Sequence, residues 1–192
     1  MNRNHKPHSA ISLVELVISI VLLGLVITGF YGIEVFSRYH LLTSDRRAKL
    51  QNEVSFLVEH MSKNLVVAMG DFDNSAVTSS GGTVTAYVDE NDDGIRDTSV
   101  AARIRYCYGS NDCGITAVAN AVYFQAGANA GELLVRRVTN FAVALDATDR
   151  NLLVIDLSAC WDPAETNSAC GSSDNPSIAL QTTIRMPSVS VN

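Results

Sequence analysis

Histidine and lysine are missing from most of this chain, and their absence limits the chemistry that it can perform. The last lysine is Lys63, and histidine occurs only at positions 5, 8, 40 and 60. The segment 71–192 therefore lacks the general base of a Ser–His–Asp or Cys–His nucleophile system, and it lacks histidine ligands for zinc. No spacing of carboxylates favours a pair of catalytic acids. We expect a protein that is not an enzyme and requires no cofactor.

Positive charge is scarce in the same segment. From Asp71 onward there are 7 arginines and 15 acidic residues, which gives 7 − 15 = −8. Such an acidic segment has no general attraction for the phosphate backbone of a nucleic acid, and no nucleic-acid partner is evident. Arg136 and Arg137 form a local basic pair. We expect them to point to opposite faces of a strand, because successive side chains of a strand alternate.

What the chain does have is a long apolar run directly after a short basic leader. Ile11–Ile33 is long enough to cross the ~30 Å hydrocarbon core of a bilayer as a helix. Arg3 and Lys6 precede the run, which favours a single pass with a cytoplasmic N-terminus. The run carries one charge, Glu15, and an ionisable group inside such a run indicates a function. The alternative is an uncleaved signal anchor in which Glu15 extends to the membrane interface.

A helical pattern continues beyond the apolar run. Proline is absent between Pro7 and Pro163, so no proline interrupts a long helix there. Apolar residues recur at steps of three and four along 37–70, which is typical of a helix with one face packed on a globular body. This stripe consists of Leu50, Val54, Leu57, Val58, Met61, Leu65 and Met69. Gly70 is the predicted end of the helix.

After Asp71 the composition changes to Ser, Thr, Gly, Asn and Asp with short β-branched runs. This pattern indicates strands that are separated by turns. The predicted strands are Thr83–Val88, Val100–Tyr108, Ala121–Gln125, Glu132–Val138, Asn140–Leu145, Leu152–Leu157 and Ile178–Met186. We therefore expect an α+β protein in which one long N-terminal helix packs on an antiparallel sheet.

All four cysteines, Cys107, Cys113, Cys160 and Cys170, lie in the segment 71–192. An even number of cysteines outside the cytoplasm favours disulfides. Three pairings are possible, and proximity in the sequence favours Cys107 with Cys113 and Cys160 with Cys170. A four-thiolate metal site is the alternative, although these spacings are not the usual close ligand spacings.

An acidic stretch, DENDDGIRD at 89–97, has the alternation of a calcium-binding loop. Gly94 stands at the sixth position, where such loops turn sharply, but Val100 stands where an EF-hand requires glutamate. The candidate ligands of a calcium ion are Asp89, Asn91, Asp93 and Asp97. A calcium site closed by backbone carbonyls and a simple solvated turn both remain open interpretations.

The start of the chain resembles a known signal. SAISLVEL is similar to the class III signal of type IV pilins and type II secretion pseudopilins. The resemblance implies that a prepilin peptidase cuts between Ala10 and Ile11 and methylates the new N-terminus. It also implies that Glu15, the fifth mature residue, pairs with the amine of Ile11 on an adjacent subunit. The family usually has Gly and Phe at these two cleavage positions, and we expect the small and apolar replacements here to be processed.

Segments of the head extend the resemblance to minor pilins of the W class and minor pseudopilins of the J class. They are YVDENDDGIRD, RIRYCY, ELLVRRVTNFAVAL and NPSIALQTTIRMPS. The resemblance implies a pilin-like fold with four parts. These are a cleaved leader at 1–10, a transmembrane and assembly half of the helix at 11–36, an amphipathic half at 37–70 and a β-rich extracytoplasmic head at 71–192.

The implied function is that of a structural, minor subunit of a type IV pilus or type II secretion pseudopilus. Its implied partners are other pilin or pseudopilin subunits, the prepilin peptidase, and the inner-membrane assembly platform with its ATPase. The implied location is the inner membrane and then a periplasmic or extracellular filament. The alternative is a signal-anchored extracytoplasmic domain that binds or adheres with calcium and does not polymerise.

Overall fold

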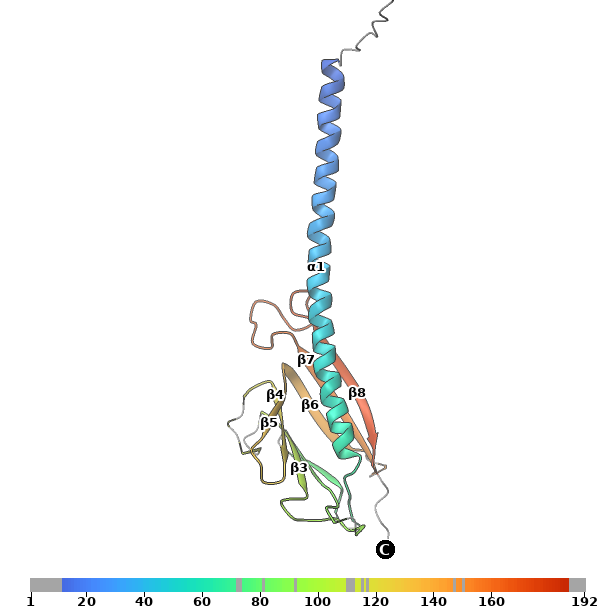
Figure 1. Cartoon of the computed structure of the whole chain (residues 1–192), viewed down its shortest axis with the longest axis vertical. Coiled ribbons are helices and arrows are strands. Elements are labelled where there is room, and N and C mark those ends of the chain that lie inside the picture. The colour runs from blue at the N-terminus through green and yellow to red at the C-terminus, as the bar shows by residue number, and fades with distance from the viewer. Residues whose placement is uncertain are drawn as a thin grey trace, which may run out of the picture. The chain divides into compact units, whose positions relative to one another are not determined.

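The computed structural model describes residues 12–71, 74–80, 82–91, 93–109, 113–114, 116, 118–146, 148–149 and 151–186. The predicted cleavage residues Ala10 and Ile11 lie outside the described residues. The chain divides into two compact units, Met1–Leu42 and Thr43–Asn192. One continuous helix, α1 (Leu13–Leu65), contributes to both units (Figure 1).

The first unit consists, in its described part, of Ser12 and the helical residues 13–42. Every described residue in this range is exposed. The helix is long and apolar enough to cross a membrane, and none of its most apolar stretch is buried. The side chain of Ser12 caps the helix, because its Oγ accepts a hydrogen bond from the Glu15 N–H at 3.2 Å.

The second unit begins with the amphipathic part of α1. Five residues of its predicted stripe are buried, namely Leu50, Val54, Leu57, Met61 and Leu65. They recur at three- and four-residue steps, so they form one face of the helix. The stripe prediction is correct for these five positions, which all belong to the hydrophobic core.

The helix ends at Leu65, before the predicted stop at Gly70. Strand-type hydrogen bonds explain the early end: the Met69 N–H donates to the Tyr87 carbonyl at 2.9 Å, and Ala68 pairs with Val88. The backbone at these residues is therefore used by the sheet. Gly70 instead allows a close approach of two backbone segments. A Cβ atom at this position would lie only 2.6 Å from the Ala76 nitrogen.

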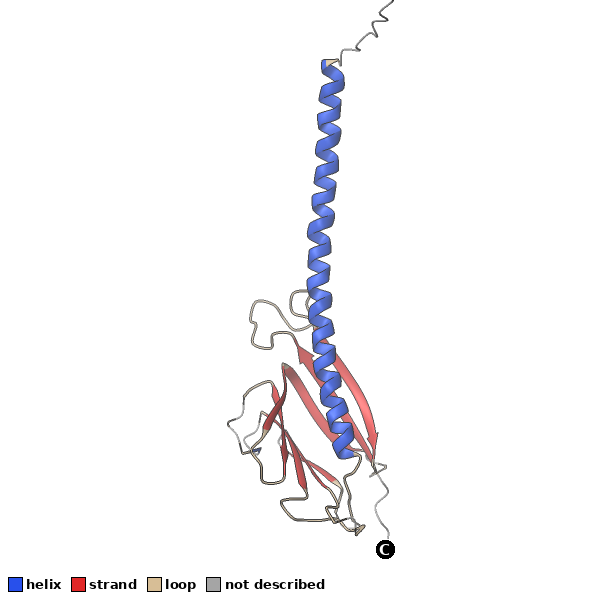
Figure 2. Ribbon diagram, viewed as in Figure 1, coloured by secondary structure: helices blue, strands red, loops and turns tan. Residues whose placement is uncertain are grey.

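Two antiparallel sheets complete the second unit (Figure 2). The first sheet has the order β1-β2-β3-β4-β5, and the second has the order β6-β7-β8. The strands of the first sheet are β1 (Val77–Ser80), β2 (Thr83–Tyr87), β3 (Arg103–Tyr108), β4 (Ala121–Ala126) and β5 (Glu132–Arg136). Those of the second sheet are β6 (Val138–Leu145), β7 (Leu152–Cys160) and β8 (Ser177–Arg185).

Both sheets bury one face in the core shared with α1. In β7 the buried residues Leu153, Ile155, Leu157 and Ala159 alternate with half-buried ones. In the first sheet Val84 and Tyr106 reach the same core. A strand with one buried face must show this two-residue period, so the period fixes which side of each sheet meets the helix.

Apart from shifts of one residue at their ends, the predicted strands differ from the observed ones in four places. Strand β7 continues to Cys160 rather than ending at Leu157. Glu132–Val138 is interrupted at Arg137, which has a φ of 68° and separates β5 from β6. Strand β3 begins at Arg103 rather than at Val100. Strand β1 was not predicted, because three of its four residues are exposed Thr and Ser. β1 has no apolar face of its own, and its pairing with β2 stabilises it.

The α1 stripe should dominate the stability of the second unit. Leu57→Ala removes a fully buried side chain, and we expect it to lower the free energy of unfolding by about 2–5 kcal/mol. The neighbouring Phe56 is 51% exposed, so Phe56→Ala is the matched control with a loss of under about 1 kcal/mol. Urea unfolding followed by circular dichroism measures both. Equal losses would contradict this packing.

Candidate functional site

The apolar part of α1 carries very few charges in its described residues. Glu15 lies in the first turn, and Glu34 pairs with Arg38 at 2.5 Å on the exposed surface. The spacing Ser12-x-x-Glu15 matches the Ser-x-x-Glu pattern of a capping box, a signal that the sequence analysis missed. Glu15 therefore lies at the positive end of the helix dipole, where a carboxylate is favoured.

The exposed apolar surface of residues 13–42 is itself the most prominent candidate site. It includes fully apolar turns, with exposures of 59% at Leu23 and 69% at Phe30, for example. A contiguous apolar surface of this kind is stable only when lipid or another protein covers it. The first unit is therefore the candidate surface for membrane insertion or for helix association.

The acidic loop at 89–97 is held by hydrogen bonds from its own backbone N–H groups to its own carboxylates. Asp89 accepts hydrogen bonds from the N–H groups of Asp93 and Gly94, at 3.3 and 2.7 Å. Asp93 accepts from the Ile95 N–H at 2.7 Å, and Asp97 accepts from the Glu90 N–H at 2.9 Å. These are Asx-type turn contacts.

The predicted calcium ligands make hydrogen bonds within the described part of the loop itself. Asn91 donates to the Asp93 carboxylate at 3.0 Å, so these two side chains bond to each other within the loop. Among the residues that the structure describes, no group of three or more His, Cys, Asp or Glu side chains forms a metal site. Calcium binding stays a prediction from the sequence.

The loop is anchored at its base by Arg96. The Arg96 side chain is only 10% exposed, stacks 4.3 Å over the Tyr87 ring and lies 4.0 Å from Asp71. This contact ties the acidic stretch to β2. The loop is thus a fixed part of the second unit.

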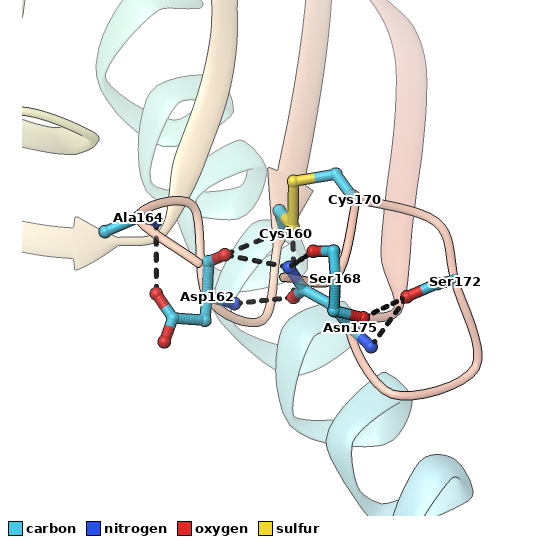
Figure 3. The surroundings of a disulfide bond; sticks show 7 residues. All are labelled: Cys160, Asp162, Ala164, Ser168, Cys170, Ser172 and Asn175. Carbon is cyan, nitrogen blue, oxygen red and sulfur yellow. Dashed lines mark hydrogen bonds between the residues drawn. A yellow bond between two sulfur atoms is a disulfide. The ribbon is translucent and has the colours of Figure 1, made fainter. Parts of the chain in front are cut away.

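Two disulfides join the cysteines in the pairings that sequence proximity favours. Cys107 is bonded to Cys113, and Cys160 is bonded to Cys170. The second bond lies in the loop between β7 and β8, and Asn175 of the same loop is only 2% exposed (Figure 3). The Asn175 amide accepts from the Asp162 N–H at 2.8 Å and donates to the carbonyls of Asp162 and Ser168, each at 2.9 Å.

The same loop docks on the start of the second unit. The Thr43 hydroxyl donates to the Ser173 carbonyl at 3.1 Å, and the Arg46 guanidinium donates to the Asp174 carbonyl. Both donors come from α1. The disulfide and Asn175 therefore hold a loop in the shape that reaches the helix, which is a structural role.

Trp161, the residue after Cys160, lies at the centre of a cluster of cations. The Arg137 guanidinium stacks 4.3 Å over the indole ring, and Arg46 and Lys49 of α1 lie at 5.6 and 6.0 Å. Arg137 also donates to the Glu53 carboxylate at 2.7 Å. Cation–π contacts and ion pairs of this kind add to packing.

This cluster corrects the expectation that Arg136 and Arg137 lie on opposite faces of one strand. Arg137 adopts a left-handed conformation between the two sheets, and its guanidinium bridges Trp161 and Glu53. Together with Arg136 these residues line a surface groove of about 640 Å³. No sequence signal indicates the cluster, because its members come from three distant segments.

His60 lies in an aromatic cluster between α1 and the first sheet. Its ring contacts Phe124 edge-on with centroids 4.7 Å apart, and its Nδ1 lies 3.0 Å from the Tyr106 hydroxyl. Burial is the main cause that lowers the pKa of His60 below 6.5; Glu132 opposes this shift and Lys63 adds to it. Burial also raises the pKa of Tyr106. The neutral imidazole is therefore the form that fits this interface.

Comparison of the chain with protein-family models, with curated proteins and with solved structures finds no significant match. Functional assignment therefore depends on the residues and contacts described above.

His60 should make the stability of the chain fall in mild acid. Because the folded pKa lies below 6.5, its contribution is complete above about pH 6.5 and is lost as the pH falls toward the folded pKa. His60→Phe keeps the ring packing and should flatten the stability profile between about pH 7 and 5. Urea midpoints at each pH measure the effect, with His40→Phe on the exposed part of α1 as control. A parent profile that is already flat there would disprove the role of His60.

Proposed function

We propose that this chain is a minor structural subunit of a type IV pilus or type II secretion pseudopilus. In this proposal the apolar part of α1 first crosses the inner membrane, with its N-terminus in the cytoplasm, and later joins the packed helices of a filament. The second unit is the extracytoplasmic head. The chain performs no catalysis of its own.

The observation that carries the proposal is the contrast along one continuous helix. Residues 13–42 are exposed and apolar, whereas the stripe from Leu50 to Leu65 is buried against the chain's own sheets. A helix that both crosses a bilayer and packs in a filament needs an apolar surface all round in its first half. Only its second half can be amphipathic.

Glu15 supports the assembly step by its position. A new amine at Ile11 would be a cation in a setting of low dielectric, where an unpaired charge is costly. The carboxylate of Glu15 on an adjacent subunit would neutralise that amine and set the axial register. The Ser12 cap holds the first turn of the helix, so the carboxylate is presented from an ordered segment.

The two disulfides support an extracytoplasmic head, because such bonds persist in oxidising compartments. The partners that this function requires are the sibling subunits, the prepilin peptidase and the inner-membrane assembly platform. A filament in the periplasm or outside the cell is the expected final location.

Processing is the direct test of this function. Mass spectrometry of the protein extracted from membranes should show a mature chain that begins at N-methylated Ile11. The host must carry a prepilin peptidase, and a host without one is the control, in which Met1 should stay in place. A chain that keeps Met1 in the competent host would instead be a signal-anchored extracytoplasmic domain.

The role of Glu15 has its own test. Glu15→Ala should be processed normally but should lower incorporation into sheared filaments by about tenfold or more, because the amine of Ile11 loses its counter-charge. Glu34→Ala removes another exposed glutamate of the same helix, one already paired with Arg38, and is the matched control. Immunoblots of sheared and membrane fractions measure the ratio. Equal incorporation of both variants would exclude the pairing.

A further inference from the structure

In its described residues, the second unit has four sheet edges, and three of them are protected against pairing with another strand. β1 has only four residues. β5 has an irregular register that leaves Leu134 unpaired, and it carries Glu132 and Arg136. β6 has an irregular register at Thr139 and lies against β1. Short strands, bulges and charges are the devices by which natural sheets block edge pairing.

β8 has none of these devices. It has nine residues in unbroken register with β7, from Ser177 to Arg185. It contains no proline, and its only charge is Arg185 at the end. Among the described residues, no strand pairs with its other edge.

The hydrogen-bond pattern shows which backbone groups face outward. The Trp161 N–H donates to the Pro176 carbonyl at 3.0 Å, and the Met186 N–H donates to the Asn151 carbonyl at 2.8 Å. Hydrogen-bonded pairs alternate along an antiparallel ladder, so the even-numbered residues of β8 bond to β7. The residues with outward N–H and C=O groups are Ser177, Ala179, Gln181, Thr183 and Arg185.

The side chains beside this edge define what fits there. Leu180 belongs to the row that faces the core, opposite buried Leu157, yet it is 38% exposed at the rim. On the outer face, Asp156 and Gln181 contribute to a groove of about 250 Å³. Within the described part of the chain, Arg185 has no carboxylate partner.

We infer that β8 is a docking edge for an extended segment of a different polypeptide, which adds to the second sheet as a fourth strand. The segment is uncharged along its centre and places apolar side chains beside Leu180. It carries an acidic residue at the end that lies next to Arg185. Backbone pairing supplies affinity, and the alternate side chains supply specificity.

A second copy of the chain does not fit this edge. β8 has no acidic residue, so β8 of a second copy cannot place a carboxylate beside Arg185. The other three edges of a second copy are protected as described above.

The test uses the unprocessed full chain in detergent micelles, so it does not depend on cleavage or filament assembly. The probe is a fluorescent peptide with two glutamates followed by the β7 sequence Leu152–Ala159, which already complements β8 in the fold. Asparagine replaces Asp156 in the probe, so that its centre is uncharged. Fluorescence anisotropy should show binding. Residue-resolved hydrogen exchange should show that the amides of Ala179, Gln181 and Thr183 are open in the free chain and protected in the complex.

Two controls isolate the backbone contact. The same peptide with every amide N-methylated keeps its side chains and should not bind. Gln181→Pro removes an outward N–H that β7 does not use, so the fold should persist, and the peptide should bind at least about tenfold more weakly. Gln181→Ala keeps the N–H and should bind like the parent.

The inference is overturned by any of four results. They are no binding at about 1 mM peptide, equal binding by the Gln181→Pro variant, equal binding of the methylated peptide, and protection of the three amides in the free chain. Protection that rises with protein concentration would assign the edge to a second copy instead.

Discussion

One apolar stripe holds the second unit together. The residues from Leu50 to Leu65 on a single face of α1 meet buried side chains of both sheets, and four of them, Leu50, Leu57, Met61 and Leu65, have no exposed surface. The two sheets are also connected directly: Arg137 is the single residue between β5 and β6, the Tyr108 hydroxyl donates to the Val138 carbonyl at 3.2 Å, and β1 lies against β6. Without the stripe, each small sheet would expose an apolar face. Burial on α1 is thus the constraint from which the order of the whole unit follows.

The first part of the same helix has a second apolar surface, which is not buried. Residues 13–42 are all exposed, so their apolar surface must be covered by lipid or by other helices. The division is sharp, because the first buried residue of α1 is Leu50 and all described residues before Thr43 are exposed. The two halves of α1 therefore need different surroundings. The second half packs on the protein's own sheets, and the first half needs an external apolar environment. This exposed apolar segment is the physical basis of the proposed function.

The periodic features of this fold are visible in the sequence, and its irregular features are not. The stripe of α1 and seven strands follow from periods of 3.6 and two residues. Strand β1 lacks an apolar row, so only its partner β2 creates it. The early helix end at Leu65 reflects backbone competition by Tyr87 and Val88, which no local propensity reports. The cap at Ser12, in contrast, is readable in the sequence as the pattern Ser12-x-x-Glu15.

The junction of the two sheets is the place where sequence reasoning fails most, and the reason is physical. Arg137 takes a left-handed φ that costs an ordinary side chain of order 1 kcal/mol or more, and tertiary contacts must offset that cost. Its guanidinium gains the Trp161 ring and the Glu53 carboxylate, while its carbonyl accepts the Cys160 N–H at 2.9 Å. Trp161 is in turn adjacent to the disulfide loop that bonds to Thr43 and Arg46. The kink between the sheets, the disulfide loop and the first packed turns of α1 are therefore one coupled structure. The strand propensity of the segment 132–138 cannot predict the kink at Arg137. Every contact that stabilises the kink comes from a distant part of the chain.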